Sequence, residues 1–308
     1  MLSASLLRAS RSARARQMTT ALPATRKVVA RFVAGENDSD ALAATQSLVA
    51  AGLLVSIDRL GEDVVDQHQA HQTADAYVQL LRRAANIGLG RSVEVSIKLS
   101  ALGQALKADG DAIALDNVRR VCQGAALHGS TVNVDMEDHT TTDSTLRIVD
   151  EVRRDFPSLG AVVQSMLRRS ERDCVALATP GSRVRLVKGA YREPTSVAFQ
   201  TKGDVDRAYQ RCLRVLIHGG SYPMIATHDT RMIRYALSRL QEAGRETSGY
   251  EFQMLYGIRT DEQRRLSELG HRMRIYVPYG DDWYAYFMRR LAERPANVGF
   301  FLRALVRQ

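Results

Sequence analysis

The sequence is poor in cysteine and lacks any long apolar run. Its 308 residues include three cysteines, Cys122, Cys174 and Cys212, which lie far apart and form no Cys-x-x-Cys pair. Three widely spaced thiols predict neither a disulfide framework nor a thiolate metal site, and they suit a reducing compartment. No segment approaches the roughly 18 consecutive apolar residues that a membrane-spanning helix needs. We therefore expect nothing in the chain to cross a membrane.

Acidic residues are missing from the beginning of the chain. Residues 1–34 contain no Asp or Glu but seven Arg or Lys, so most of the formal charge of +9 is local. We expect residues 1–34 to form a basic helical arm and residues 35–308 to form the main domain. A solvated helix is the favoured interpretation, contact with anionic lipid comes second, and an organelle transit peptide is the other alternative.

The charge pattern also bears on partners and location. No basic patch with interleaved aromatic residues follows the arm, so nucleic acid is not an expected partner. We expect a cytoplasmic protein, peripheral on the inner membrane if the arm contacts lipid. The alternative location, if the arm is a transit peptide, is the mitochondrial matrix.

Domain linkers rich in Pro, Gly or Ser are absent, as are repeats of solenoid period. Instead, short runs rich in Val, Ile, Leu or Tyr alternate with longer amphipathic segments. Eight strands are predicted, beginning at Leu53, Ser92, Ser130, Ala161, Val184, Tyr222, Tyr250 and Arg272. Eight strands alternating with helices over about 250 residues predict a (β/α)8 barrel as a single domain.

A glycine fingerprint for a dinucleotide is also lacking. A doubly wound sheet, the alternative architecture, carries G-x-G-x-x-G where a strand turns into a helix. The nearest candidate, Gly88-Leu89-Gly90, has no third glycine and precedes a predicted strand. The barrel is therefore the favoured fold.

Polar side chains are present at or near the carboxyl end of every predicted strand. A buried charge costs several kcal/mol unless it is paired, and barrel enzymes place their chemistry at these ends. The whole set therefore predicts an active site at one mouth of the barrel. It comprises Asp58, Lys98, Asp135, Glu137, Gln164, Arg185, Lys188, His228, Gln253 and Tyr276.

Two short motifs raise the alternative of a metal site. The string DMEDH, residues 135–139, has alternating carboxylates that could hold Mg²⁺. His68 and His71 lie three apart on an amphipathic segment without a third ligand nearby. Because only one face of a strand points inward, we expect Asp138 to leave the site. A metal is the less favoured interpretation.

The string YAYFMRRLAE, residues 284–293, predicts a helix near the C-terminus. Its three- and four-residue spacings bring Tyr286, Arg289, Arg290 and Glu293 to one side. A solvated charged face is the ordinary explanation of such a cluster. The alternative is that these groups point at a ligand.

Five motifs in this order closely resemble the proline dehydrogenase family. They are VRLVKGAY from Val184, ATHD from Ala226, FQMLYG from Phe252, RIYVPYG from Arg274 and YAYFMRRLAE from Tyr284. The resemblance extends from about Arg31 to Phe301. It implies a distorted (β/α)8 barrel that binds FAD without a Rossmann domain. It also implies oxidation of L-proline to Δ1-pyrroline-5-carboxylate, with electrons passed from the reduced flavin to a membrane quinone.

The chain has no long C-terminal extension for the aldehyde-oxidising enzyme of the bifunctional relatives. We therefore expect the monofunctional bacterial type, with a separate pyrroline-5-carboxylate dehydrogenase as a candidate partner.

The resemblance further implies roles for individual residues. It implies Arg185, Lys98, Tyr276 and Asp135 as catalytic residues, with Arg185 near the flavin N5 and Asp135 bracing the site. The implied substrate contacts are Lys98, Arg289 and Arg290 at the carboxylate, Leu255, Tyr276 and Tyr286 around the ring, and Glu62 as a gate. The implied cofactor contacts are Gln164, Arg185, Lys188, Gly189, Ala190, His228 and Glu293. For Glu62, a solvated residue at a helix start is an equal alternative.

Elementary chemistry supports this assignment. Guanidinium groups bind a carboxylate through two parallel hydrogen bonds, which lysine cannot reproduce. Cations such as Arg185 and Lys188 stabilise negative charge that develops on a reduced flavin. Two alternatives stay open from the residues alone: a Schiff-base aldolase that uses Lys98 or Lys188, and a non-catalytic barrel that binds an amino acid.

Overall fold

Eight parallel strands close into a barrel in the computed structural model, which describes residues 29–61 and 64–293, the side chains of 289–293 excepted. Each strand pairs with the next along the chain, and the last pairs with the first. All eight predicted strands and the predicted (β/α)8 barrel are confirmed. The strands are β1 (Leu54–Arg59), β2 (Val93–Ile97), β3 (Thr131–Val134), β4 (Gly160–Gln164), β5 (Arg183–Val187), β6 (Tyr222–Ala226), β7 (Glu251–Leu255) and β8 (Met273–Tyr279).

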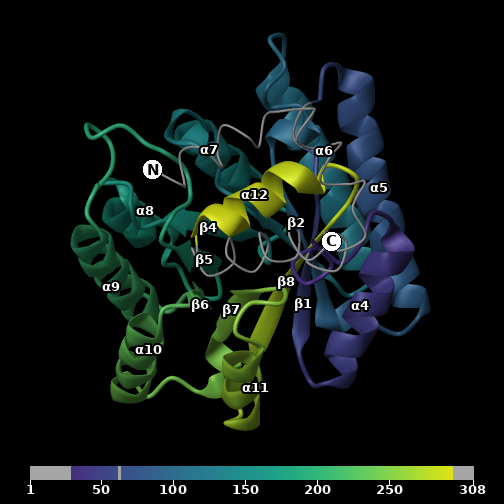
Figure 1. The fold of residues 1–308 in the computed structure, drawn as a ribbon. Coiled ribbons are helices and arrows are strands. Elements are labelled where there is room, and N and C mark those ends of the chain that lie inside the picture. The colour runs from purple at the N-terminus through teal and green to yellow at the C-terminus, as the bar shows by residue number, and fades with distance from the viewer. Residues whose placement is uncertain (1–28, 62–63, 294–308) are drawn as a thin grey trace, which may run out of the picture.

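Helices surround this barrel (Figure 1). The α-helices before the last strand are α4 (Asp38–Ala50), α5 (Gln67–Asn86), α6 (Gly110–Leu127), α7 (Thr142–Arg153), α8 (Ser170–Leu177), α9 (Lys202–His218), α10 (Thr230–Glu242) and α11 (Thr260–Glu268). Short 3-10 turns are η1 (Gly90–Ser92), η2 (Ser100–Leu102), η3 (His139–Thr141) and η4 (Thr247–Gly249).

Side chains at the helix starts explain where several helices begin. The Asn37 side chain accepts hydrogen bonds from the backbone N–H of Ser39 and Asp40 at the start of α4. Thr201 does the same for Asp204 at the start of α9. Such caps satisfy donors that have no partner inside the helix.

The alternation of side chains along each strand separates an apolar core from a polar interior. On β2, Val93, Val95 and Ile97 belong to the main hydrophobic cluster, which also contains the inward faces of the helices. Glu94 and Ser96 lie between them and bond to arginines of β5. Successive residues of a strand point to opposite faces, so the barrel interior receives the polar set.

The barrel is closed unevenly. Strands β1 and β8 pair over six residues of register, whereas β3 and β4 pair over two, Asn133 with Gly160 and Val134 with Ala161. At Gly160 an added Cβ would lie 2.2 Å from the Asn133 side chain, so only glycine fits this close approach.

The last helix, α12 (Trp283–Glu293), follows β8 and differs from the outer helices in its placement. Figure 1 shows it in yellow, lying across the barrel rather than alongside it. Its inner face packs against residues from the other end of the described chain: Val29, Phe32 and Val33 share a hydrophobic cluster with Trp283, Phe287 and Met288. The predicted helix is confirmed. Of the predicted basic arm, residues 1–28 lie outside the described part.

None of the helices within the described ranges combines the length and the apolar character that crossing a bilayer requires.

Candidate active site

A cavity of about 440 Å³ opens at the carboxyl ends of the strands. This volume lies within the roughly 300–1,000 Å³ usual for small-molecule sites. Tyr286 of α12 borders it, so the helix that crosses the barrel mouth forms part of its wall. The residues predicted from the sequence that line it are Asp58, Lys98, Asp135, Gln164, Arg185, Lys188, Gly189, Ala190, His228, Gln253, Leu255, Tyr276 and Tyr286.

The Arg185 guanidinium forms the floor of the cavity and is 3% exposed. Its Nε–H donates to the Gln253 side-chain oxygen at 2.5 Å, and Nη1 donates to Asp135 Oδ1 at 2.6 Å. Nη2 donates to Glu94 Oε1 at 2.9 Å. The other acceptors are the hydroxyls of Ser56 and Ser96. Burial disfavours this cation, but the Asp135 and Glu94 carboxylates outweigh burial and raise the pKa of Arg185.

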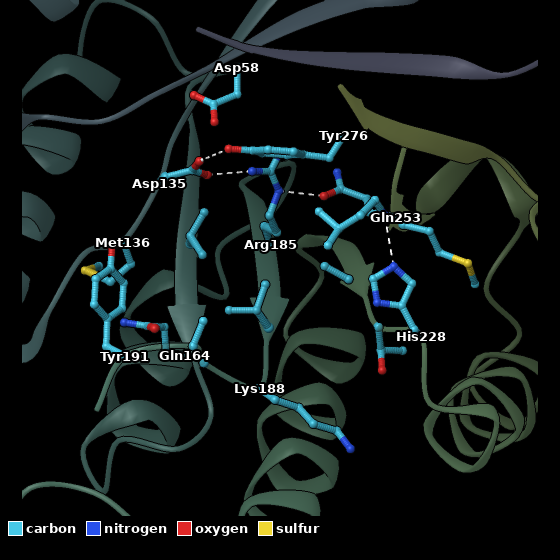
Figure 2. Close-up of a pocket in the computed structure, with 18 of the residues that line it drawn as sticks. Asp58, Asp135, Met136, Gln164, Arg185, Lys188, Tyr191, His228, Gln253 and Tyr276 are labelled. Carbon is cyan, nitrogen blue, oxygen red and sulfur yellow. Dashed lines mark hydrogen bonds and ion pairs between the residues drawn. The ribbon is translucent and has the colours of Figure 1, made fainter. Parts of the chain in front are cut away.

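Tyr276 lies against this arginine. Its hydroxyl donates to Asp135 Oδ2 at 2.7 Å, while the Arg185 guanidinium carbon is 5.4 Å from its ring centroid. Burial, followed by the Asp135 charge, raises the pKa of Tyr276 well above its ordinary value. The phenol therefore stays a hydrogen-bond donor. Figure 2 shows Asp135 joining Tyr276 and Arg185 through its two carboxylate oxygens.

Lys98 lies at the same end of the barrel, directly after β2. Its ammonium donates to both carboxylate oxygens of Asp58, at 2.9 and 3.0 Å. Asp58 is 1% exposed, and this burial raises its pKa although Lys98 lowers it. The sequence placed Asp58 at a strand end without giving it a role, and the structure makes it the partner of Lys98.

Two further predicted cofactor contacts are held by neighbouring backbone. The Leu255 N–H donates to Nε2 of His228 at 3.0 Å. In the neutral ring this bond places the proton on Nδ1. The Gln164 amide donates to the Glu137 carbonyl oxygen at 2.7 Å, which fixes its orientation. Both side chains line the cavity.

Lys188 and Gly189, directly after β5, differ in how they face the cavity. The Lys188 ammonium donates to Asp206 at 2.5 Å and to Asp229 at 2.8 Å, and it points away from the Arg185 group (Figure 2). Gly189 has φ +111°, and an added Cβ would lie 2.3 Å from Met166 Sδ. Glycine is therefore required there, and the cavity meets backbone at this position.

The motifs that raised the metal alternative are dispersed. Glu137 accepts from the N–H and hydroxyl of Ser100, at 3.0 and 2.7 Å, and so holds η2. The exposed Asp138 caps η3, which confirms that it leaves the site. His68 bonds to Gln72 and His71 to Asn117. Across residues 29–61 and 64–293, no three His, Cys, Asp or Glu side chains gather as a metal site.

Four predicted site residues cannot be placed. Glu62 lies outside the described residues, as do the side chains of Arg289, Arg290 and Glu293, whose backbone belongs to α12. Their assigned roles stay predictions.

A layer of charged residues beneath the cavity was missed from the sequence. Arg183 donates to Glu94 Oε2 at 2.6 Å, and Arg274 donates to Glu251 at 2.7 and 3.1 Å. Burial alone would raise the pKa of Glu94, but three nearby arginines lower it by more than burial raises it. The net pKa is below its ordinary value, so Glu94 stays charged. The sequence held a partial signal: Arg183, Glu251 and Arg274 lie two residues before the predicted Arg185, Gln253 and Tyr276, so each shares a strand face with a predicted residue. Which of these charges pair with one another was not predictable.

Comparison with known proteins agrees with this geometry. The family model described as "Proline dehydrogenase" matches residues 41–303. The chain is 40% identical over 279 residues to proline dehydrogenase of Deinococcus radiodurans, covering 90% of this chain and 89% of that protein. It is 37% identical over 284 residues to proline dehydrogenase 1 of Bacillus subtilis, covering 92% of each.

Among solved structures, the chain resembles proline utilization A (PutA) of Bdellovibrio bacteriovorus, inactivated by N-propargylglycine. The TM-score is 0.81 at 26% identity, over 87% of this chain and 33% of that one. The chain thus spans about a third of the length of this solved relative.

Proposed function

The chain belongs to the proline dehydrogenase family, and we propose that it oxidises L-proline to Δ1-pyrroline-5-carboxylate with FAD held in the barrel cavity. The observation that carries this proposal is a cavity whose cationic floor, aromatic walls and glycine-lined edge come from the segments matched by the family model. We place the cofactor at the mouth of the barrel because the cavity opens there.

The residues present fit a flavin. A flat ring with polar edges fits a cavity that has apolar walls for the ring faces and hydrogen-bonding groups for the ring edges. Val162, Val187 and Met254 give the cavity apolar surface. Gln164, Arg185 and His228 present polar atoms around it, and the backbone at Gly189 and Ala190 gives close approach. A flavin held by these residues would supply the hydride acceptor for oxidation of proline at C5.

The protein's own part in the reaction is binding, orientation and electrostatics. Arg185 is a fixed cation on the cavity floor, and its five hydrogen bonds need no rearrangement as negative charge develops above it. Tyr276 is held by Asp135 at one edge. The ring walls assigned to Leu255, Tyr276 and Tyr286 orient the pyrrolidine and exclude water.

The carboxylate of proline is assigned to Lys98, Arg289 and Arg290. Lys98 reaches the cavity with Asp58 at its side. The family motif assigns the two arginines, which lie on the helix that carries Tyr286. The family resemblance also assigns Glu62, in the string DRLGE, as a gate that pairs with Arg289, and it assigns Lys188 and Glu293 as cofactor contacts.

Electron transfer beyond the flavin follows from the family resemblance. We propose a membrane quinone as acceptor, with the basic residues 1–34 favouring a peripheral position on an anionic membrane surface. The chain is 27% identical to the relative named "Bifunctional protein PutA" of Escherichia coli and covers 24% of that protein's length. For this chain, we propose that a separate pyrroline-5-carboxylate dehydrogenase consumes the product.

The aldolase alternative is disfavoured by the surroundings of its lysines. A Schiff-base lysine must present a free amine. Lys98 and Lys188 instead each donate hydrogen bonds to carboxylate oxygens within 3.0 Å, so both side-chain nitrogens are engaged by acidic partners.

The absorption spectrum of the purified protein, recorded before and after adding L-proline without oxygen, tests the proposal. We expect flavin bands that bleach with proline, and no bleaching in an Arg185→Met variant over the same interval. A colourless protein that cannot take up added FAD would falsify the assignment. Trapping of a lysine adduct by borohydride would favour the aldolase instead.

A further inference from the structure

Arg185 is held by acceptors from several strands of the barrel. Glu94 and Ser96 lie on β2, Asp135 directly follows β3, and the Ser56 hydroxyl comes from β1 at 3.1 Å. Gln253 comes from β7, on the other side of β5. Figure 2 shows the guanidinium between Asp135 and Gln253. Among the described residues, Gln253 is the one hydrogen-bond acceptor of Arg185 from β6, β7 or β8.

The two sides differ in charge. Both carboxylate partners, Asp135 at 2.6 Å and Glu94 at 2.9 Å, lie on the β2–β3 side. They attract the guanidinium in one direction. The partner on the β7 side is a neutral amide at 2.5 Å. This hydrogen bond from a charged donor opposes a shift of the guanidinium toward the two carboxylates.

The orientation of this amide is itself determined. Gln253 Nε2 donates to Glu251 Oε1 at 2.5 Å, which leaves the amide oxygen for Arg185. Glu251 is fully buried and accepts from Arg274 Nε and Nη2 at 2.7 and 3.1 Å. A flipped amide would place its NH₂ against Arg185 and its oxygen against the Glu251 carboxylate. Glu251 therefore excludes the flipped amide.

We propose that Gln253, oriented by Glu251, is a positioning residue that centres the Arg185 guanidinium in the cavity that would hold the flavin. The inference rests on the proposed function, because the property that the Arg185 charge would change is the reduction potential of a bound flavin. Without Gln253 the two carboxylates draw the guanidinium toward β2 and β3. The reduced flavin then loses part of its electrostatic stabilisation.

The test is the two-electron midpoint potential of bound FAD in Gln253→Met, a neutral variant of similar length. We expect the potential to fall by about 30 mV, corresponding to about a tenfold loss in stabilisation of the reduced form. The matched control is Tyr222→Phe, which removes a 3.1 Å hydrogen bond to Glu251 without touching Arg185. The control should keep the wild-type potential.

The outcomes separate the two proposals. A wild-type protein that binds no FAD overturns the proposed function. A folded, FAD-loaded Gln253→Met protein with the wild-type potential overturns the positioning role, and a lower melting temperature alone would then make Gln253 merely structural. If Gln253→Met does not fold, Gln253→Asn is used. It keeps an amide but is one methylene shorter, and the same fall in potential is expected.

Discussion

Lys98 carries its positive charge into the cavity already paired to a carboxylate. Its ammonium lies 2.9 and 3.0 Å from the oxygens of the buried Asp58. A substrate carboxylate that approaches Lys98 must share this cation with Asp58, so Lys98 alone is a weak anchor. The guanidiniums assigned from the family motif, Arg289 and Arg290, should therefore supply most of the binding energy for the substrate carboxylate.

Replacement of Arg290 by methionine tests that inference. We expect the KM for proline to rise at least about tenfold, because a charge-assisted hydrogen bond is worth about 1.5–3 kcal/mol. Steady-state kinetics with an artificial electron acceptor measures it. Arg264→Met, on the exposed face of α11, is the matched control and should leave KM unchanged. A KM within about threefold of wild type would contradict the assignment.

The sequence predicted that Asp135, Arg185 and Tyr276 lie together, and the structure joins them by hydrogen bonds. Asp135 directly follows β3, whereas Arg185 and Tyr276 lie within β5 and β8. Glu94 and Glu251 were missed because they lie at or near the beginnings of their strands, where the barrel rule predicts no chemistry. Pairing between distant strands stabilises these charges, and no local pattern reveals such pairing.

At the level of elements, α12 is held across the barrel mouth by the segment that precedes α4. Phe32 and Phe287 have ring centroids 6.2 Å apart, and Trp283 packs against Phe287 at 6.0 Å. Phe32 is 5% exposed and Phe287 is fully buried. The helix was predictable from its spacing. Its placement was not, because it depends on contacts between opposite ends of the chain.

The variant Phe32→Ala should loosen α12. Truncation of a buried phenylalanine costs about 3–5 kcal/mol of unfolding free energy. Because Tyr286 lines the cavity from this helix, we also expect KM for proline to rise. Thermal melting and kinetics measure the two effects. Leu269→Ala, at a side chain that is 57% exposed, is the control. A folded Phe32→Ala protein with wild-type KM would show that α12 is positioned by other contacts.

At the level of the whole molecule, the barrel interior is polar both at the cavity and in the charged layer beneath it. Eight alternations of strand and helix predicted the barrel, but barrel interiors are usually filled by branched apolar residues. Here Glu94 and Glu251 are fully buried among arginines. The pKa of each is lowered: burial opposes this shift, and Arg274 and the other arginines cause it.

This interior predicts sensitivity to acid. A carboxyl group with a lowered pKa contributes its full stabilisation above its ordinary value, 4.5 for Glu94 and Glu251, and loses it as the pH falls toward the folded-state pKa. Asp58 acts in the opposite direction, because its pKa is raised. We expect the melting temperature to drop steeply below about pH 4.5. Thermal melts from pH 7 to pH 3 measure the effect.

Glu94→Gln is the informative comparison for these melts. It should melt lower than wild type at pH 7, since three arginines lose a shared counterion. Its melting temperature should then change less between pH 4.5 and pH 3. A wild-type melting temperature that is constant from pH 6 to pH 3 would refute this account.

The charged layer inside the barrel also limits how the protein can be redesigned. Glu94, Glu251, Arg183 and Arg274 come from four different strands and pair with one another; all but the partly exposed Arg183 are buried. A library that randomises one of these positions leaves the other three with an unbalanced charge inside the barrel. We therefore expect most of its members to fail to fold. Mutagenesis of this barrel should therefore vary the four positions together, so that each variant keeps a balanced set of charges.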